Sequence, residues 1–432
     1  MDEVQQPQTA PDGAPRVLDV AGLDLADTAT WQPGMPHAQL DILRAKAPVA
    51  WQDEAVVEHR SSELNSGIPA PYSPGYWAVT SHALVEEASK HPELYSSALG
   101  GVQLHSTDEI TLAGLRLMML AMDPPHQLRL RKIVSPSFNP RSVNALADYV
   151  TEQSVRIAAE LAGAGTVDFV DVVSKELTTL VLAKILGIPE SDRHLIVRWS
   201  DALIGFEAAE QSGDMDTTFA MHMELLEYGR SVCTARRANP TDDLMSQIAN
   251  AEVDGDRLTE DEFCFFWLLL IIAGNETTRN SLSGAVIALL EHDKWRDLGA
   301  DAAPLTGPCV EELIRYVTPV IQFRRTATRD VVLGEQAIRA GDKVVLYYTA
   351  ANRDPAVFAD PHQLDLTRDP NPHLAFGIGP HFCLGTRLAR LQIATMLKEL
   401  ATRYPKLALD GDVQRIKSTF IAGVDHLPIR VG

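Results

Sequence analysis

The distribution of apolar residues along the chain predicts a protein built mainly from helices. Apolar residues recur at helical spacing over about residues 146–186 and 219–250. A third helix is expected from Glu260 to about His292, with Thr259 as its N-cap. The stretch Phe265–Ile272 is apolar on every face, so this third helix should cross the protein interior.

Short β-like runs interrupt the helical pattern. Two of them lie at residues 49–51 and 76–80, each bounded by turn-forming residues. Between Thr326 and Leu346, β-branched residues and two glycines predict short strands and hairpins, and a meander rich in Pro and Asp follows from Asp354 to Pro372. No internal repeat or interdomain linker is evident. We expect a mainly α fold with a small β portion.

The domain organisation follows from the same pattern. Residues 1–31 begin with a stretch rich in Gln, Pro, Asp and Gly, which predicts a flexible N-terminal arm. Residues 32–432 are expected to form a single helix-rich catalytic domain.

Charge and cysteine usage narrow the class of protein. The formal net charge of −20 argues against nucleic-acid binding and against a basic membrane anchor. The longest apolar run is shorter than the roughly 20 residues that span a bilayer, and the N-terminus lacks the features of a signal peptide. Four widely spaced cysteines favour a reducing compartment over a disulfide framework. We expect a cytoplasmic protein without membrane or nucleic-acid partners.

The most informative segment is the glycine-studded turn from Phe376 to Gly385, which contains Cys383. Apolar residues at helical spacing follow it, so a helix should start near Leu384. A cysteine at a helix N-terminus favours the thiolate, and a thiolate in such a turn is a good axial ligand for haem iron. The alternative interpretation of Cys383 is a small buried hydrophobic residue.

The spacing Phe-Gly-x-Gly-x-His-x-Cys-x-Gly resembles the haem-ligand signature of the cytochrome P450 family. The resemblance implies a cytochrome P450 fold and haem b as cofactor. It makes Cys383 the metal ligand, and it places Phe376 and Gly385 against the haem.

A second segment, Ala273-Gly-Asn-Glu-Thr-Thr278, places weak helix formers in the middle of the third helix, which suggests a functional distortion. It is similar to the oxygen-binding groove of the family. The resemblance implies that Gly274 provides room over the haem, that Ala273 contacts it, and that Glu276 and Thr277 are the acid and alcohol of a proton relay. A polar helix end with a satisfied glutamate is the alternative.

A third segment, Glu312-Leu-Ile-Arg315, places an acid and a base on one helix face. By itself the spacing is typical of a surface pair. Its position matches the ExxR motif of the family, in which the pair braces the meander before the cysteine turn. Glu312 and Arg315 are therefore expected to have a structural role.

Buried basic groups should meet the haem propionates, which are carboxylates. The family pattern leaves open whether Gln127 or the neighbouring His126 makes one contact. The residues that the resemblance implies for propionate or haem binding are Gln127, Arg131, Arg325, His373 and His381.

Electrons are expected from a ferredoxin and its flavin-containing reductase, since no flavin or iron–sulfur segment is present. A basic patch could guide the ferredoxin, although unrelated surface charges are the alternative; its six residues are Arg129, Arg131, Lys132, Arg141, Arg387 and Arg390. The expected substrate pocket is apolar, which indicates a lipophilic substrate. Its expected residues are Leu269, Ile272, Val320, Ile321, Phe420 and Ile421.

The chain thus resembles a ferredoxin-dependent haem-thiolate monooxygenase. Such an enzyme uses O2 to hydroxylate its substrate, which is expected to be a steroid, terpenoid or branched lipid. We expect the protein to be a monomer. The motif segments look especially similar to actinobacterial members that oxidise steroids and branched lipid chains. Three alternatives remain at this point. They are a biosynthetic P450 acting on a polyketide or macrolide, a peroxide-driven relative, and a non-catalytic haem sensor or carrier.

Overall fold

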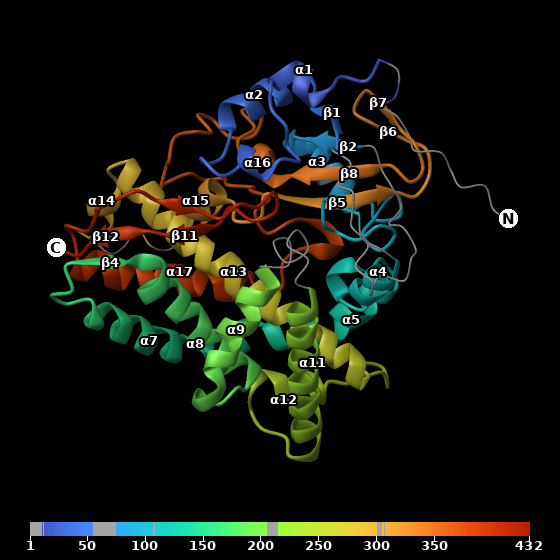
Figure 1. Cartoon of the computed structure of the whole chain (residues 1–432). Coiled ribbons are helices and arrows are strands. Elements are labelled where there is room, and N and C mark those ends of the chain that lie inside the picture. The colour runs from blue at the N-terminus through green and yellow to red at the C-terminus, as the bar shows by residue number, and fades with distance from the viewer. Residues whose placement is uncertain are drawn as a thin grey trace.

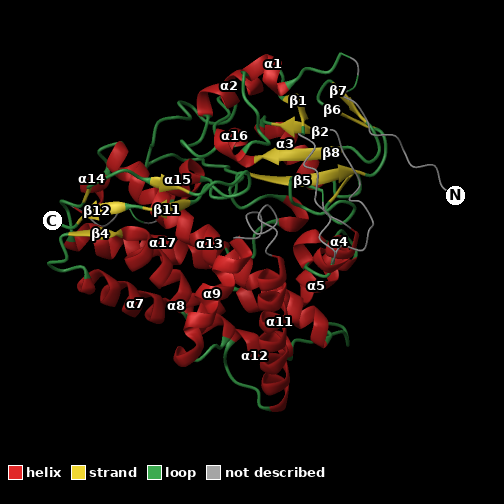
Figure 2. Ribbon diagram, viewed as in Figure 1, coloured by secondary structure: helices red, strands yellow, loops and turns green. Residues whose placement is uncertain are grey.

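The computed structural model describes residues 11, 13–54, 75–106, 109–204, 215–299, 305 and 307–432. Helices dominate, and they gather on one side of the molecule while most strands lie on the other (Figures 1 and 2). The longer helices are α2 (His37–Lys46), α3 (His82–Lys90), α5 (His126–Val134), α7 (Ala147–Glu160), α8 (Glu176–Leu186), α9 (Arg193–Ile204), α11 (Met215–Ala238), α13 (Glu260–Glu291), α15 (Pro308–Val317) and α17 (Thr386–Arg403). Shorter helices are α1 (Val17–Ala21), α4 (Glu109–Leu115), α6 (Pro140–Asn144), α12 (Leu244–Ala249), α14 (Trp295–Gly299) and α16 (Tyr348–Ala351).

The main sheet has five strands in the order β1-β2-β8-β5-β3. Its β2 and β8 are parallel, whereas the other neighbours are antiparallel. Its strands are β1 (Val49–Asp53), β2 (Gly75–Val79), β3 (Tyr95–Ser96), β5 (Gln322–Ala327) and β8 (Lys343–Tyr347). Smaller sheets are formed by β4 (Thr166–Asp168), β12 (Pro428–Arg430) and β9 (Ala408–Leu409), by β6 (Val331–Leu333) and β7 (Gln336–Ile338), and by β10 (Gln414–Arg415) and β11 (Val424–His426).

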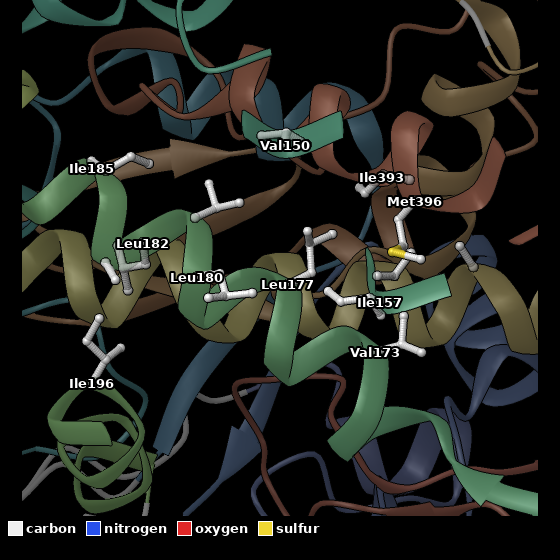
Figure 3. Close-up of a cluster of buried hydrophobic side chains, with 14 of the residues drawn as sticks. Val150, Ile157, Val173, Leu177, Leu180, Leu182, Ile185, Ile196, Ile393 and Met396 are labelled. Atoms are coloured by element: carbon white, nitrogen blue, oxygen red, sulfur yellow. The ribbon is translucent and has the colours of Figure 1, made fainter. Parts of the chain in front are cut away.

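Helix α13 is the central element of the helical side (Figure 1). Its start is the predicted one, because Thr259 and Glu262 form a reciprocal capping box at the first turn. It contacts α8, α9, α11, α15 and α17. Figure 3 shows side chains of α8 gathered with Ile196 of α9 and with Ile393 and Met396 of α17 in the main hydrophobic cluster. Because other helices surround α13, the position of its side chains is fixed by packing along most of its length.

Two expectations from the sequence need correction. The region 146–186 is not continuously helical, because Gly163 and Gly165 adopt positive φ and the following strand β4 pairs with β12 near the end of the chain. The flexible arm is wrong for the part from Gly13 to Trp31, since Trp31 is buried and its ring stacks on Tyr347 at 5.9 Å. Residues 1–10 and 12 lie outside the described residues.

Candidate active site

The cysteine turn, residues 376–385, is closed by backbone hydrogen bonds and leads into α17. The N–H of Cys383 donates to the carbonyl of Phe376 at 2.9 Å. Gly379 has φ +74°, and a Cβ there would lie 2.6 Å from the carbonyl oxygen of Ser89, so only glycine fits. The sulfur of Cys383 accepts a hydrogen bond from the N–H of Gly385, the N-cap residue of α17. The turn therefore holds the thiol at a helix N-terminus, as the sequence predicted.

The four cysteines differ in their surroundings. Cys383 is accessible, whereas Cys233, Cys264 and Cys309 are buried. Burial raises the pKa of Cys264 to about 11 and that of Cys309 to about 12, so both remain protonated thiols. Protein atoms packed around Cys383 also raise its pKa, but the Gly385 N–H and the charges of Arg131 and Arg390 oppose that shift. Cys383 is thus the cysteine best suited to act as a thiolate ligand.

Two side chains of α5 bind the backbone of the cysteine turn. The amide of the buried Gln127 donates to the carbonyl of Pro380 at 2.7 Å. The guanidinium of Arg131 donates to the carbonyls of Pro380 at 3.0 Å and Phe382 at 2.6 Å. His126 is exposed on the outer side of α5. Of the two neighbouring candidates, Gln127 is the one that reaches the turn.

Positive charge accumulates beside the turn. Burial lowers the pKa of His381 to about 3, with further contributions from the charges of Arg325 and Arg131. Arg325 is buried, and among the described residues neither arginine has a carboxylate partner. The side-chain amide oxygen of Gln127 also has no hydrogen-bond partner among the residues that the structure describes. An anionic ligand with two carboxylates, such as haem, fits these unpaired cations.

His373, predicted to bind a haem propionate, lies beside Glu311. Its Nδ1 accepts from the N–H of Ala375 at 3.3 Å, and its Nε2 contacts Glu311 at 3.1 Å. Both ring nitrogens of His373 therefore have partners within the protein, as does Nε2 of His381, and the propionate role of His373 stays a prediction. The sequence analysis missed Glu311, which also binds Arg390 and thereby joins α15 to α17. Arg390 in turn lies over the ring of Phe376, at 4.7 Å from its centroid.

The middle of α13 presents an accessible face. Ala273 is exposed and Thr277 partly exposed, one turn apart, although the residues between and beside them are mostly buried. The hydroxyl of Thr277 donates to the carbonyl of Ala273 at 2.7 Å. Gly274 was predicted to provide room over the haem, but a Cβ at this position would meet Leu182 of α8 at 3.4 Å. That distance is an ordinary van der Waals contact, so the role of Gly274 over the haem stays a prediction.

Glu276 is buried and held by its neighbours on α13. Its carboxylate forms an ion pair with Arg279 at 2.8 Å and accepts from the amide of Asn280 at 3.4 Å. The carbonyl oxygen of the Asn280 side chain accepts from the N–H of Val424 at 3.0 Å, which ties this group to β11. Glu276 and Thr277 are adjacent in sequence and point in different directions around the helix. A proton that passes between them must travel through water or follow a side-chain rotation.

Glu312 and Arg315 form a fully buried ion pair with two hydrogen bonds of 2.7 Å. The free edge of the Arg315 guanidinium donates to the carbonyls of Asn352 and Pro361 in the meander. The structural role predicted for this pair agrees with these contacts. Sequence reasoning missed the groups that complete the network, which are the side chains of Arg368 and Asn371 on Glu312.

The residues predicted for the substrate pocket lie on α13 or on two loop segments around residues 320 and 420. Val320 and Ile421 form an isolated bridge, and the N–H of Ile321 donates to the carbonyl of Phe420 at 2.8 Å, so the structure joins these two distant segments. The ring of Phe420 packs against Phe323, a neighbour that the sequence analysis missed, at 5.3 Å.

Burial distinguishes the remaining pocket candidates. Ile321 is fully buried in a core cluster with Val345 and Tyr347, so its assignment to the pocket is wrong. On α13, Ile272 is partly exposed, whereas Leu269 is only 8% exposed one turn before Ala273.

The predicted basic patch is partly neutralised, because three of its six residues pair with carboxylates. Arg129 pairs with Asp256 and Glu262, and Arg390 pairs with Glu311. Lys132 pairs with Asp254, and Arg131 binds the carbonyls of the cysteine turn. Arg141 and Arg387 are exposed. Arg131, Arg141 and Arg387 have no carboxylate partner among the described residues, so only part of the predicted patch remains uncompensated.

Comparison with known proteins agrees with this geometry. The Cytochrome P450 family model matches residues 300–422. A steroid C26-monooxygenase of Mycobacterium tuberculosis is 37% identical over 94% of this chain and 92% of its own length. A methyl-branched lipid omega-hydroxylase of the same species is 34% identical over 96% of each protein. The structure of a Mycobacterium marinum cytochrome P450 in complex with pseudoionone matches with a TM-score of 0.83 and 37% identity, covering 94% of this chain and 97% of that one.

The relatives are named as monooxygenases and hydroxylases, and the cofactor of the family is haem bound through a cysteine thiolate. None of the described helices combines the length and apolar character needed to span a bilayer. The predicted mainly α fold with small β-sheets is confirmed by the match to solved P450 structures. The chain belongs to the cytochrome P450 family and is a haem-thiolate monooxygenase.

Proposed function

We propose that this P450 hydroxylates a lipophilic molecule of the steroid or methyl-branched lipid class, with terpenoids as a related possibility. The observation that carries the proposal is the accessible thiol of Cys383 at the start of α17, in a chain with an accessible face at Ala273 and Thr277 on α13. The similarity to relatives named for steroids and methyl-branched lipids supports the substrate class. Apolar side chains at Ile272, Val320, Phe420 and Ile421 suit such a substrate.

Cys383 is the proposed axial ligand, and Arg131, Arg325 and His381 are the proposed partners of the haem propionates. The chemistry that the haem supplies when bound is the reductive activation of dioxygen. Gln127 and Arg131 hold the carbonyls of the cysteine turn, which limits the positions that the thiolate can adopt. Glu312 and Arg315 contribute from further away by fixing the meander.

Thr277 and Glu276 are the proposed proton donors. The hydroxyl of Thr277 lies on the accessible face of α13, and its oxygen can accept a proton or a water while it donates to Ala273. Glu276 supplies the acidic group behind it, oriented by Arg279 and Asn280. In this proposal the two side chains hold and pass on the two protons that oxygen activation consumes.

The proposed electron donors are a ferredoxin and its reductase, and the protein is proposed to act as a cytoplasmic monomer with one catalytic domain. The partly neutralised basic patch limits the electrostatic part of ferredoxin docking to a few groups, among them the exposed Arg141 and Arg387. Affinity for an acidic ferredoxin should consequently show a shallow dependence on ionic strength.

The test is a combined spectral and product assay. The reduced, CO-bound enzyme should show the far-red-shifted Soret band of a thiolate-bound haem, and Cys383→Ser should lose it. A 3-keto steroid and a methyl-branched fatty acid should then gain one oxygen atom in the presence of NADH, ferredoxin and reductase. A normal thiolate spectrum without product from any ligand that shifts the spectrum would favour the sensor or carrier alternative.

A further inference from the structure

Asn275 lies between Gly274 and Glu276 in the motif segment of α13, and the proposed chemistry leaves it without a role. Its side chain is buried, at 1% exposure, and points away from the accessible face of the helix. Asparagine is a weak helix former, and a buried amide is costly unless its donor and acceptor are both satisfied. Its partners therefore indicate what it does.

The amide of Asn275 joins three helices. Its Oδ1 accepts from the hydroxyl of Thr178 on α8 at 2.8 Å, and its Nδ2 donates to the hydroxyl of Ser200 on α9 at 2.8 Å. Thr178 and Ser200 are also buried. The Thr178 hydroxyl has one proton to donate, and its other possible acceptors, the carbonyls of Ser174 and Lys175, are farther away at 3.0 and 3.3 Å, so Asn275 is its nearest acceptor. The arrangement requires a donor and an acceptor on one side chain, which leucine and aspartate both lack.

The turn of α13 that Asn275 occupies is intrinsically weak. Gly274 raises the free energy of the helix, and the hydroxyl of Thr277 competes for the backbone carbonyl of Ala273. Eight residues before Asn275, the ring of Trp267 contacts the ring of Trp199 on α9, with 5.6 Å between the ring centroids. At the turn of Asn275, the side-chain amide hydrogen-bonds α13 to α8 and α9.

We propose that Asn275 is a positioning residue, which fixes the turn carrying Glu276 and Thr277 by hydrogen-bonding it to α8 and α9. The inference rests on the proposed function, because it assigns Asn275 to the proton-donating turn. The physical reason is that two opposed hydrogen bonds restrict both rotation of the helix about its axis and local opening of the turn. A looser turn lets water reach Thr277 in more than one geometry, and reduced oxygen is then released as peroxide before it reacts with substrate.

A matched control exists on the same helix. The hydroxyls of Ser174 and Ser283 form a second buried contact between the segment before α8 and α13, at 2.8 Å. Ser283 lies six residues beyond Thr277, about 9 Å further along the helix. Ser283→Ala removes a buried polar contact of the same kind without touching the turn of Asn275.

The test compares Asn275→Leu, Ser200→Ala and Thr178→Val with Ser283→Ala in the holoenzyme. In the resting ferric enzyme, backbone amides over residues 273–279 should exchange about tenfold faster in the first three variants, as the loss of one or two buried hydrogen bonds implies. In turnover, these variants should release several-fold more peroxide per NADH, with unchanged affinity for substrate. Ser200→Thr keeps the hydroxyl and should restore both quantities.

The proposal would be overturned if Asn275→Leu and Ser283→Ala showed equal amide exchange over residues 273–279 and equal peroxide release. Asn275 would then be an ordinary core amide with satisfied hydrogen bonds. Should Asn275→Leu not fold, Ser200→Ala and Thr178→Val carry the same comparison. Failure of the proposed function is distinguishable, because wild-type enzyme would then form no product while the exchange measurement in the ferric enzyme still decides the role of Asn275.

Discussion

Glu276 and Arg279 form a buried ion pair on α13, with 2.8 Å between the carboxylate oxygen and the guanidinium nitrogen and less than a tenth of either side chain exposed. The pair holds the carboxylate of Glu276 on a different side of the helix from the adjacent Thr277. It also supplies the positive charge without which a buried carboxylate would be unfavourable. The carboxylate of Glu276 and the hydroxyl of Thr277 are thus on adjacent residues but do not contact each other in this arrangement.

The first prediction concerns the acid itself. Glu276→Gln preserves the shape of the side chain and its contact with Asn280 but removes the proton-transfer group. The hydroxylation rate should fall roughly 100-fold, the lower end of the range for general acid–base groups, and the solvent deuterium isotope effect on it should rise. Glu291→Gln, at the exposed end of the same helix, is the control and should be unchanged. A wild-type rate in Glu276→Gln would remove the carboxylate from the proton path.

A second prediction separates two neighbouring alcohols. Thr277 is partly exposed on the accessible face of α13, whereas Thr278 is buried. Thr277→Ala should divert electrons to hydrogen peroxide and lower product per NADH several-fold, because oxygen activation loses one of its proton donors. Thr278→Val should leave that ratio near the wild-type value. Product and peroxide are measured in the same reaction, and equal ratios in wild type and Thr277→Ala would refute the assignment.

The third prediction concerns stability. Arg315→Met leaves the carboxylate of Glu312 buried with only part of its partners, which should lower the free energy of unfolding by about 3–5 kcal/mol. The meander would lose its bonds to Arg315 as well, so the CO spectrum should lose intensity at the thiolate band. Arg403→Met breaks an exposed pair with Glu399 and should cost less than about 1 kcal/mol. Urea unfolding of both variants checks the difference, and similar losses would contradict the bracing role.

The fourth prediction is a pH dependence centred on His37. Burial, with the charges of Arg353 and other nearby groups, lowers the pKa of His37 from 6.5 to about 2 in the folded protein. Its place in the first turn of α2 also disfavours a positive charge. Below pH 6.5 the unfolded chain binds a proton that the folded chain does not, so stability present above that pH is lost as the pH falls.

One such proton corresponds to about 1.4 kcal/mol for each pH unit well below the unfolded pKa. His37→Gln removes this group and should flatten the decline in unfolding free energy between pH 7 and about pH 5. The measurement is urea unfolding of both proteins at the two pH values. Parallel declines in wild type and variant would show that His37 does not contribute.

Features determined by neighbouring residues were predictable. The capping residues Thr259 and Glu262 start α13 where its polar-to-apolar pattern begins, and the glycines around Cys383 close the predicted turn. The spacing of Glu312 and Arg315 likewise placed both on one helix face. In each case the interacting groups lie within one or two turns of each other, so local geometry is sufficient.

Predictions failed where the outcome depended on contacts between distant segments. Ile321 was assigned to the substrate pocket, yet it is buried in a core cluster with Val345 and Tyr347. Arg129 and Lys132 were assigned to a basic patch, yet they pair with Asp256 and Asp254, which lie 127 and 122 residues away in the sequence. The stretch 146–186 is helix-patterned, but β4 inside it pairs with the last strand of the chain. None of these partners is visible in a local pattern.

The sequence by itself determined the family, the fold class and the cysteine turn, and it nominated the acid and the alcohol, because each follows from a short motif whose geometry is local. The tertiary structure decided which cations have carboxylate partners, which apolar residues are buried in the core, and that Asn275 joins α13 to α8 and α9. Those facts depend on which side of each helix or strand is covered by another segment, and that packing is set by the whole chain.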